Sequence, residues 1–475
     1  MNESNINRDE AYYLAQYAIE YAEKKGVRDA EIFFSDSKKL EVTCSGKEIV
    51  NEKEVQELGF GIRVLQDSVE GFSYTNKTDK KAIEQTVEQA IVMLKVKPKK
   101  EGIALAPPSS YSTIEGLFSK RLSSFTVEEL IDGAKQILLP FEEAPISVRT
   151  DLSRIILSEE YVGIVNSLGV EGNYIRNSLD SSFLAIAREG EKVGSFVLDS
   201  FSVKDPKEID FYKFGKDLVE RAIRNVNVEK LKSIDSDIVV FKPEAVTNPL
   251  FIVIAMAISA ERTQHNQSLW KDSIGEKVAI DDFSFIDNSL DGKFSTARPF
   301  DDEGTPVKEL EIIKDGVLMT HLFDIKTANK VNTQSTGNSY RGFINSSFMN
   351  PPNNIFPNVP VIKHGDTKYT EMIEDIKEGI ILEYFAGSQR SENGIFSGVA
   401  KGAQLIKNGE ITTPLTNVTI AGNVFDLLKN IVSLSKETKK VNGYLETPYI
   451  KTKGCLLYTS PSPRDLSTSR MPSSA

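Results

Sequence analysis

The stretch PLFIVIAMAISAERTQH, residues 249–265, contains the longest apolar run of the chain. The run extends from Leu250 to Ala260 and is interrupted only by Ser259. It is too short to span a bilayer, because a membrane helix needs about 20 apolar residues. A helix that is apolar on nearly every face is buried, so we predict a core helix that is packed on all sides. Pro243 suits the first turn of this helix.

Strand-like segments surround the predicted helix. They include DIVVFKP (237–243), VAIDDFSFID (278–287), GIILEYFAG (379–387) and GAQLIKNGEITTPLTNVTIAG (402–422). The sequences at Lys314–Gly316 and Asn408–Gly409 are Asp-Gly and Asn-Gly turns, which typically join the strands of a hairpin. We therefore predict a β-rich C-terminal domain over residues 235–454 that contains a buried helix.

The first 230 residues show a different order of elements. A helix over residues 9–26 ends at Gly26, and a second helix covers residues 79–95. Between them lie four strand-like segments: AEIFFSD (30–36), KLEVTCSG (39–46), LGFGIRVL (58–65) and VEGFSYTN (69–76). This pattern predicts an N-terminal α+β domain over residues 1–100.

A linker and a second unit follow. Residues 101–120 belong to a stretch of Lys, Pro and Ser without a period, which is typical of a linker. Residues 121–230 alternate in the manner of an antiparallel meander, with turns at SLG (167–169) and REGEK (188–192) and flanking helices at 126–138 and 211–224. The predicted fold class is α+β: N-terminal α/β units with antiparallel strands, followed by the β-rich C-terminal domain.

Charge and composition exclude several classes of protein. The chain has 57 Lys and Arg against 68 Asp and Glu, a net charge of −11, which disfavours nucleic acid as a partner. Two cysteines, Cys44 and Cys455, provide no disulfide framework. The N-terminus lacks the basic and apolar regions of a secretory signal. We predict a cytoplasmic protein with no membrane partner.

The composition changes after Gly454. Residues 455–475 are rich in Ser, Pro and Arg and have no period. We predict that this tail is not native and exclude it, with Cys455, from the functional argument.

Six segments together resemble a known family. They are DAEIFFSDSKKLEVTCSGKEI (29–49), LGFGIRVLQDSVEGFSYTN (58–76), PFDDEGTP (299–306), IIKDGVL (312–318), STGNSYR (335–341) and KNGEITTPLTNVTIAGN (407–423). In order and spacing the chain resembles the TldD/PmbA family, also called modulators of DNA gyrase, and more closely the PmbA (TldE) branch. The resemblance implies a cytosolic zinc metallopeptidase complex, typically a heterodimer of the two branches, which cleaves peptides or unfolded proteins.

The resemblance also implies where a zinc site would lie. The TldD branch holds zinc with two histidines of an H-E-x-x-x-H helix and a cysteine near the C-terminus. With SLWKDSIGEKVA (268–279) as the anchor, Phe251 and Met256 take the histidine positions, Ile252 the glutamate position and Asn442 the cysteine position. Phe cannot bind zinc, a thioether binds it poorly, and no base remains to activate water. We predict no catalytic residue, metal ligand or cofactor in this chain, and zinc in a TldD-type partner.

Other polar residues are weaker candidates for substrate binding. The three histidines, His265, His321 and His364, are scattered, which favours surface or hydrogen-bonded roles; His265, just beyond the predicted helix, stays a candidate. The acids Asp301, Asp302 and Glu303 could hold a hard cation, or could belong to a turn with Gly304 and Pro306. Arg341 in STGNSYRG could reach a substrate carboxylate, or lie in a solvated loop.

Two hypotheses follow for the function. The first is a PmbA/TldE-like, non-catalytic subunit that pairs with a TldD-like metal-bearing chain and helps to hold a peptide or unfolded protein. The alternative is a self-sufficient metallopeptidase homodimer with an unrecognised site, although its ligands are not evident in the sequence.

Overall fold

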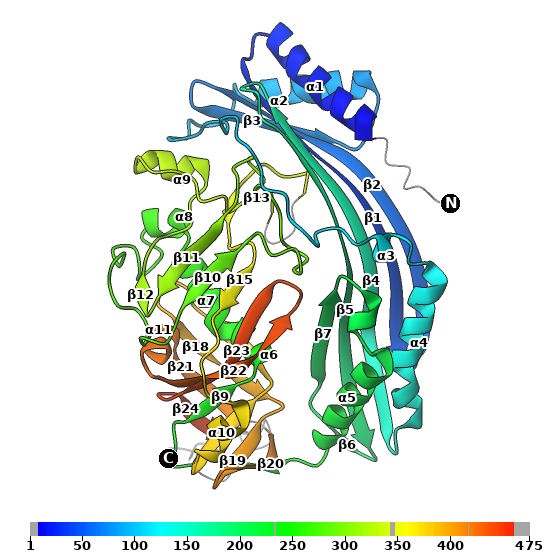
Figure 1. Ribbon diagram of the computed structural model, residues 1–475, viewed down its shortest axis with the longest axis vertical. Coiled ribbons are helices and arrows are strands. Elements are labelled where there is room, and N and C mark those ends of the chain that lie inside the picture. The colour runs from blue at the N-terminus through cyan, green and yellow to red at the C-terminus, as the bar shows by residue number, and fades with distance from the viewer. Residues whose placement is uncertain (1–7, 232–233, 343–346, 417, 460–475) are drawn as a thin grey trace, which may run out of the picture.

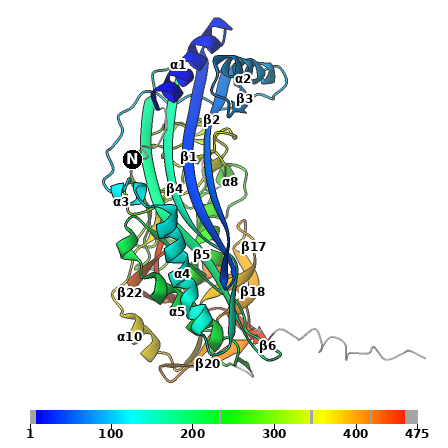
Figure 2. The same cartoon turned by 90° about the vertical axis from the view of Figure 1, so that its right-hand side faces the viewer.

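The computed structural model describes residues 8–231, 234–342, 347–416 and 418–459. Figure 1 shows two parts: a long, curved sheet built by the first half of the chain, and a C-terminal unit that lies along one side of it. The turned view in Figure 2 shows the long strands running nearly the whole height of the molecule.

The long sheet has seven antiparallel strands in the order β3-β2-β1-β4-β5-β6, with β7 also paired to β5. The strands are β1 Asp29–Gly46, β2 Glu48–Gln66, β3 Val69–Thr75, β4 Ser147–Asn166, β5 Glu171–Glu189, β6 Lys192–Val193 and β7 Val197–Val203. The predicted meander and both of its turns are confirmed, since β4 and β5 pair from Ser147↔Arg188 to Val165↔Glu171. Because β1 pairs with β4, the sheet is continuous across the connection near residue 100.

The predicted break in the first strand is wrong. Residues 30–36 and 39–46 form one strand of 18 residues, β1, instead of two. The polar residues between them continue the ladder: Ser37 faces Glu57 of β2 and Glu160 of β4. The ion pair of Lys38 with Glu54, at 2.9 Å, adds a diagonal cross-strand contact. A polar run can therefore stay in a strand that has partners on both sides.

Two pairs of helices cover the long sheet at different ends (Figures 1 and 2). Helices α1 and α2 bury alanines and Ile83 against β1 and β2, with Phe34 and Phe60 at the centre of this cluster. Helices α4 and α5 cover the other end with Phe141 and Leu218. The helices of this half are α1 Arg8–Lys24, α2 Lys80–Met93, α3 Lys120–Ser123, α4 Val127–Glu143, η1 Pro206–Glu208 and α5 Phe211–Arg224.

The helix predictions for this half hold, with one difference in length. Helix α5 has the predicted limits, α2 begins after the N-cap Asp79, and Gly26 lies just beyond α1 with a φ of 88°. Helix α4 continues past the predicted end at Leu138 and contains Pro140. Pro140 is buried beside Phe141, so packing on the sheet outweighs the hydrogen bond that a proline removes.

The C-terminal unit contains sheets of eleven, four and two strands. The largest has the order β12-β11-β10-β15-β23-β9-β16-β19-β20-β8 with β22 paired to β23; the four-stranded sheet has the order β17-β18-β21-β24. The strands are β8 Glu229–Lys230, β9 Val239–Phe241, β10 Phe285–Asn288, β11 Glu309–Lys314, β12 Val317–Leu318, β13 Ser339–Tyr340, β14 Asn354–Ile355, β15 Pro360–Ile362, β16 Glu378–Leu382, β17 Tyr384–Gln389, β18 Ile395–Lys401, β19 Gln404–Lys407, β20 Glu410–Thr416, β21 Val418–Asn423, β22 Ile431–Val441, β23 Leu445–Thr452 and β24 Leu456–Thr459. The helices α9 Ile325–Lys330, α10 Tyr369–Glu374 and α11 Val424–Lys429 lie between these strands in sequence.

Both predicted hairpin turns are present in this unit. Asp315 and Gly316 join β11 to β12 with φ values of 48° and 77°, and Asn408 and Gly409 join β19 to β20 with 50° and 81°. Such positive φ angles are what Asp-Gly and Asn-Gly turns provide. The predicted α+β class, with a β-rich C-terminal part, is confirmed. The domain limits drawn from the sequence stay a prediction.

The fold continues beyond Gly454, where the sequence indicated a break. Strand β24 pairs with β21, and Cys455 is buried in the core of the C-terminal unit. The origin of the remaining tail lies outside the described residues. Within the described ranges, no helix is long and apolar enough to cross a membrane.

Candidate functional site

The predicted core helix is present but is divided into four short segments. They are α6 Pro243–Val246, η2 Thr247–Phe251, α7 Ile252–Ala257 and α8 Ala260–Gln264. Pro243 occupies the first turn of α6, as predicted. The chain leaves helical geometry at Asn248, which has an extended backbone (φ −140°, ψ 122°) and precedes a cis bond to Pro249, and again at Ser259 (φ −72°, ψ 121°), directly before α8. A residue before proline is driven out of the helical region, so the expectation of one continuous helix is wrong.

The burial of this segment is uneven. Leu250, Phe251 and Ile254 have 0% exposure, whereas Ile252 and Met256 are partly exposed. Residues four apart lie on the same face of a helix, so Ile252 and Met256 form one incompletely covered face. The prediction that the segment is packed on all sides is wrong for this face.

Phe251 lies in a cage of aromatic rings. Its ring centroid is 5.7 Å from that of Phe356, 5.8 Å from Tyr444 and 6.3 Å from Phe285. The contact with Phe356 is edge to face, an arrangement that aromatic pairs favour. The cage fills the volume beside Phe251 with apolar side chains from β10 and from the segments around residues 356 and 444.

Asn442 lies at the tip of the hairpin between β22 and β23, two residues before Tyr444. Its φ of 51° fits the turn, and its side-chain oxygen accepts a hydrogen bond of 3.0 Å from Ser200 Oγ of β7. Burial raises the pKa of Tyr444, and a side-chain hydrogen bond with Asn442 acts in the opposite direction. Tyr444 thus connects the Phe251 cage to the hairpin tip.

The acidic segment 301–303 is a buried turn. The Asp301 carboxylate accepts hydrogen bonds from the backbone N–H groups of Glu303, at 3.0 Å, and Thr305, at 2.9 Å. Asp302 pairs with Arg298 at 2.8 Å, and Glu303 accepts from the Ile325 N–H at 3.0 Å. Burial raises the pKa of Asp301 and of Glu303. The turn interpretation is confirmed; the role of these acids in substrate binding stays a prediction.

Arg341 lies within the same buried network and has 0% exposure. Its Nε donates to the Asp302 carbonyl at 3.1 Å, and its guanidinium pairs with Glu31 of β1. Arg63 of β2 pairs with Glu31 at 3.4 Å and with Glu70 at 2.7 Å. The network therefore ties the long sheet to the C-terminal unit through charges that water does not reach.

Comparisons with known proteins agree with this architecture. Family models described as PmbA/TldA metallopeptidase domain 1, central domain and C-terminal domain match residues 30–94, 120–226 and 236–457. These ranges cover most of the chain. It belongs to the PmbA/TldD family.

Individual relatives of the family are distant but match over most of their length. A zinc metalloprotease TldD homolog of Saccharolobus solfataricus is 26% identical over 444 residues, 90% of this chain and 93% of the relative. A metalloprotease PmbA homolog of Haemophilus influenzae is 24% identical over 440 residues, 89% of this chain and 90% of the relative. The crystal structure of TldE from Thermococcus kodakarensis has a TM-score of 0.84 at 23% identity and covers 94% of this chain and 99% of that chain. This last likeness shows the fold.

The side chains at the ligand positions that the resemblance implies do not fit a zinc ion. At the implied ligand positions, Phe251 offers a ring enclosed by other rings, and Met256 a thioether. Asn442 offers an amide whose oxygen is bound by Ser200. Zinc in peptidases is held by imidazole, carboxylate or thiolate groups, so no step of a zinc mechanism can be assigned to these side chains.

The three histidines lie apart from these positions, and each donates a ring N–H to a backbone carbonyl. His265 is exposed and bonds Glu261 at 2.6 Å; His364 is also exposed and bonds Gly365 at 2.8 Å. His321 is buried and bonds Trp270 at 2.9 Å, and burial lowers its pKa. Across the described part of the chain, no group of three His, Cys, Asp or Glu side chains is placed to hold a metal ion. A substrate role for His265 stays a prediction.

The structure contains a second ionic cluster, centred on Glu383, that the sequence did not predict. Glu383 lies between β16 and β17 and is paired with Lys242 at 2.7 Å, Arg221 at 3.0 Å and Arg224 at 2.6 Å. Both arginines are on α5, which covers the long sheet. Burial alone would raise the pKa of Glu383, but the charges of Lys242, Arg221 and Arg224 outweigh it and lower the pKa to about 2.

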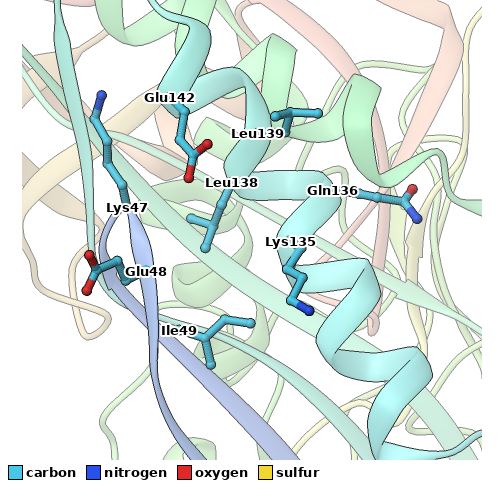
Figure 3. A pocket seen from close by; sticks show the side chains of 8 residues that line it. All are labelled: Lys47, Glu48, Ile49, Lys135, Gln136, Leu138, Leu139 and Glu142. Carbon is cyan, nitrogen blue, oxygen red and sulfur yellow. The ribbon is translucent and has the colours of Figure 1, made fainter.

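Figure 3 shows a pocket whose lining includes none of the residues of the two ionic clusters. Its volume is about 480 Å³, and it lies between the β1–β2 hairpin and α4. Lys47, Glu48, Lys135 and Glu142 point around an apolar floor that includes Leu138 (Figure 3). Because the pocket is lined by two cations and two anions, its charge does not favour either an anionic or a cationic ligand.

Proposed function

We propose that this chain is a PmbA/TldE-type subunit that does not hold zinc itself. It pairs with a TldD-type, metal-bearing chain and takes part in the proteolysis of peptides or unfolded proteins. The family membership supports the link to proteolysis, because relatives of both branches are named metalloproteases. The fold shared with the Thermococcus kodakarensis TldE supports the choice of branch.

The enclosure of Phe251 carries the proposal. The resemblance implies that its position corresponds to a ligand histidine in the TldD branch, and its ring is in contact with the rings of Phe285, Phe356 and Tyr444. A metal ion placed there would lose its water shell and gain no ligand atom, which costs many kcal/mol for a charged species. A supporting subunit has no need for such ligands, since its partner supplies them.

The β-rich unit offers a way to hold a peptide. Strand β17 is an outer strand of the four-stranded sheet. An extended peptide can add to the edge of a sheet through backbone hydrogen bonds, which tolerates many sequences. This mode suits a subunit that receives peptides of varied composition.

The decisive experiment measures metal and activity in the same preparation. Zinc is quantified by mass spectrometry in the purified chain, and peptide cleavage is followed with the chain alone and after addition of a TldD-type chain. We expect less than stoichiometric zinc in the lone chain and cleavage only in the mixture. Cleavage by the lone chain that a chelator abolishes would instead establish the alternative, a self-sufficient homodimer.

A further inference from the structure

Three basic side chains gather where the long sheet meets the C-terminal unit. Arg176 is on β5, Lys204 directly follows β7, and Lys440 is near the end of β22. A methyl group added to Gly443 would lie 2.6 Å from Cβ of Ser202, so the β22–β23 hairpin tip packs directly on β7. These cations therefore border the hairpin tip that carries Asn442.

Lys204 is held by backbone groups alone. Its Nζ donates to the carbonyl of Asn177 at 2.6 Å and to that of Leu117 at 3.3 Å. Among the described residues, no carboxylate lies within ion-pair distance of this ammonium. A largely buried charge without a counter-ion is costly, yet the two carbonyls hold Lys204 in one place.

Lys440 adds a second cation without a carboxylate partner in the described ranges. Its Nζ donates to the Lys293 carbonyl at 2.7 Å and lies 4.9 Å from the centre of the Phe294 ring. The side chain is partly exposed, so an anion in solution can reach it. Arg176, on β5, is paired with Glu160. One oxygen of Glu160 accepts hydrogen bonds from its Nε at 2.9 Å and from its Nη2 at 2.6 Å.

Charges of both signs act on Lys204, and burial has the largest effect on it. Burial, and then the charges of Arg176 and Lys440, lower the pKa of Lys204 to about 7. Asp180 and Glu208 act in the opposite direction, and neither is within ion-pair distance of the Lys204 ammonium in the described ranges. Asp180 accepts from Ser178 Oγ at 2.6 Å, and Glu208 accepts from the Asp205 N–H at 3.0 Å.

We infer that Lys204 and Lys440, supported by Arg176, form a binding site for a carboxylate of a peptide. The carboxylate is either the C-terminus of the peptide or an acidic side chain. The inference rests on the proposed function, because it places the anion of a peptide beside Asn442, the position of the third zinc ligand in the TldD branch. Lysine ammonium groups suit a single carboxylate as compact point charges, and the net charge of −11 disfavours the phosphates of nucleic acid.

The test compares three probes with the full chain by isothermal titration calorimetry. The probes are an N-acetylated alanine pentapeptide with a free C-terminus, its C-terminal amide, and the same amide with one central glutamate. We expect at least one of the two acids to bind about tenfold more tightly than the plain amide, as about 1.4 kcal/mol of charge-assisted hydrogen bonding requires. Whichever acid binds identifies the source of the carboxylate.

Two variants on the same strand isolate the site. Lys440→Gln keeps a donor for the Lys293 carbonyl but removes the charge, and we expect it to abolish the preference for the acid. Lys436→Gln removes an equal charge from an exposed position of β22, and we expect the preference to remain. Binding of the acid should also slow the acetylation of Lys204 by acetic anhydride, followed by mass spectrometry.

Equal affinity for acid and amide would refute the proposed site. An equal loss of the preference for the acid in Lys440→Gln and Lys436→Gln would refute it as well. Phosphate that binds as tightly as the acids would overturn it as well, because the site would then accept any anion. These binding measurements need neither zinc nor cleavage. Zinc found in the lone chain would therefore refute the proposed function without affecting the carboxylate test. Equal binding of acid and amide would refute the carboxylate site without affecting the proposed function.

Discussion

Replacing Glu383 by glutamine removes one negative charge that Lys242, Arg221 and Arg224 share. The size and shape of the side chain stay nearly the same, so the change tests charge. The side chain of Glu383 is 4% exposed, and solvent screening is weak there. The variant leaves three cations with less compensation, which links α5 less firmly to the C-terminal unit.

The magnitude follows from the pKa. A carboxyl whose pKa falls from 4.5 to about 2 on folding contributes about 3 kcal/mol at neutral pH, since one pKa unit corresponds to about 1.4 kcal/mol. This contribution is fully present above pH 4.5 and is lost as the pH falls toward 2. We expect Glu383→Gln to lower the free energy of unfolding by about 3 kcal/mol at pH 7, and by less than half of that near pH 3.

The chain has one tryptophan, Trp270, packed 5.1 Å from Phe425 in the core of the C-terminal unit. Its fluorescence in a urea titration reports the unfolding of the unit that contains Glu383. Glu220→Gln is the matched control, since Glu220 is on α5 beside Arg221 and pairs with Lys216 at 3.8 Å on the exposed surface. We expect no measurable shift for the control. A Glu383→Gln midpoint equal to that of Glu220→Gln would refute the reasoning.

Three further outcomes are expected. Phe251→Ala should lower the free energy of unfolding of the C-terminal unit by about 3–5 kcal/mol, because it opens a cavity in the aromatic cage. Phe251→Leu should lower it by less. Equal urea midpoints for the two variants, measured by Trp270 fluorescence, would show that the packing of the cage does not stabilise the unit. The triple change Phe251→His, Ile252→Glu and Met256→His should give a poorly soluble protein without stoichiometric zinc, because it places a polar imidazole in the apolar ring cage around position 251 and leaves Asn442 unchanged; a soluble variant that binds zinc and cleaves peptides would prove the opposite. Arg341→Lys should lower the thermal midpoint, because one ammonium cannot reach both Glu31 and the Asp302 carbonyl as the guanidinium does; the exposed change Arg149→Lys serves as its control.

Much of the fold is encoded in local patterns. The strands of the central meander alternate between apolar and polar residues, and the Asp-Gly and Asn-Gly turns define two hairpins of the C-terminal unit. The polar half of β2, from Glu48 to Glu57, has no such pattern because both of its faces are largely exposed. Its pairing with β1 therefore depends on a neighbour that the local sequence does not reveal.

The candidate site was harder to predict because its key contacts are long-range. Glu31 and Arg63 are charged residues inside apolar strands, a signal that such groups are paired when buried, but their partner Arg341 is far away in sequence. Glu383 and the α5 arginines give no local signal, because charged residues on a helix are usually solvated. Pro249, directly before the apolar run, does give a local signal, because the residue before a proline is driven out of the helical region.

The pairing of Glu31 with Arg341 joins residues that are 310 positions apart. A ribosome adds about 5–20 residues per second, so roughly 15 to 60 s separate the synthesis of these two partners. During that interval β1 and β2 can assemble, but Glu31 and Arg63 lack the third member of their network. A nascent chain of this protein therefore carries the Glu31 carboxylate without its Arg341 partner on an otherwise formed sheet, and stalling of translation before residue 341 should leave that sheet face open to chaperones.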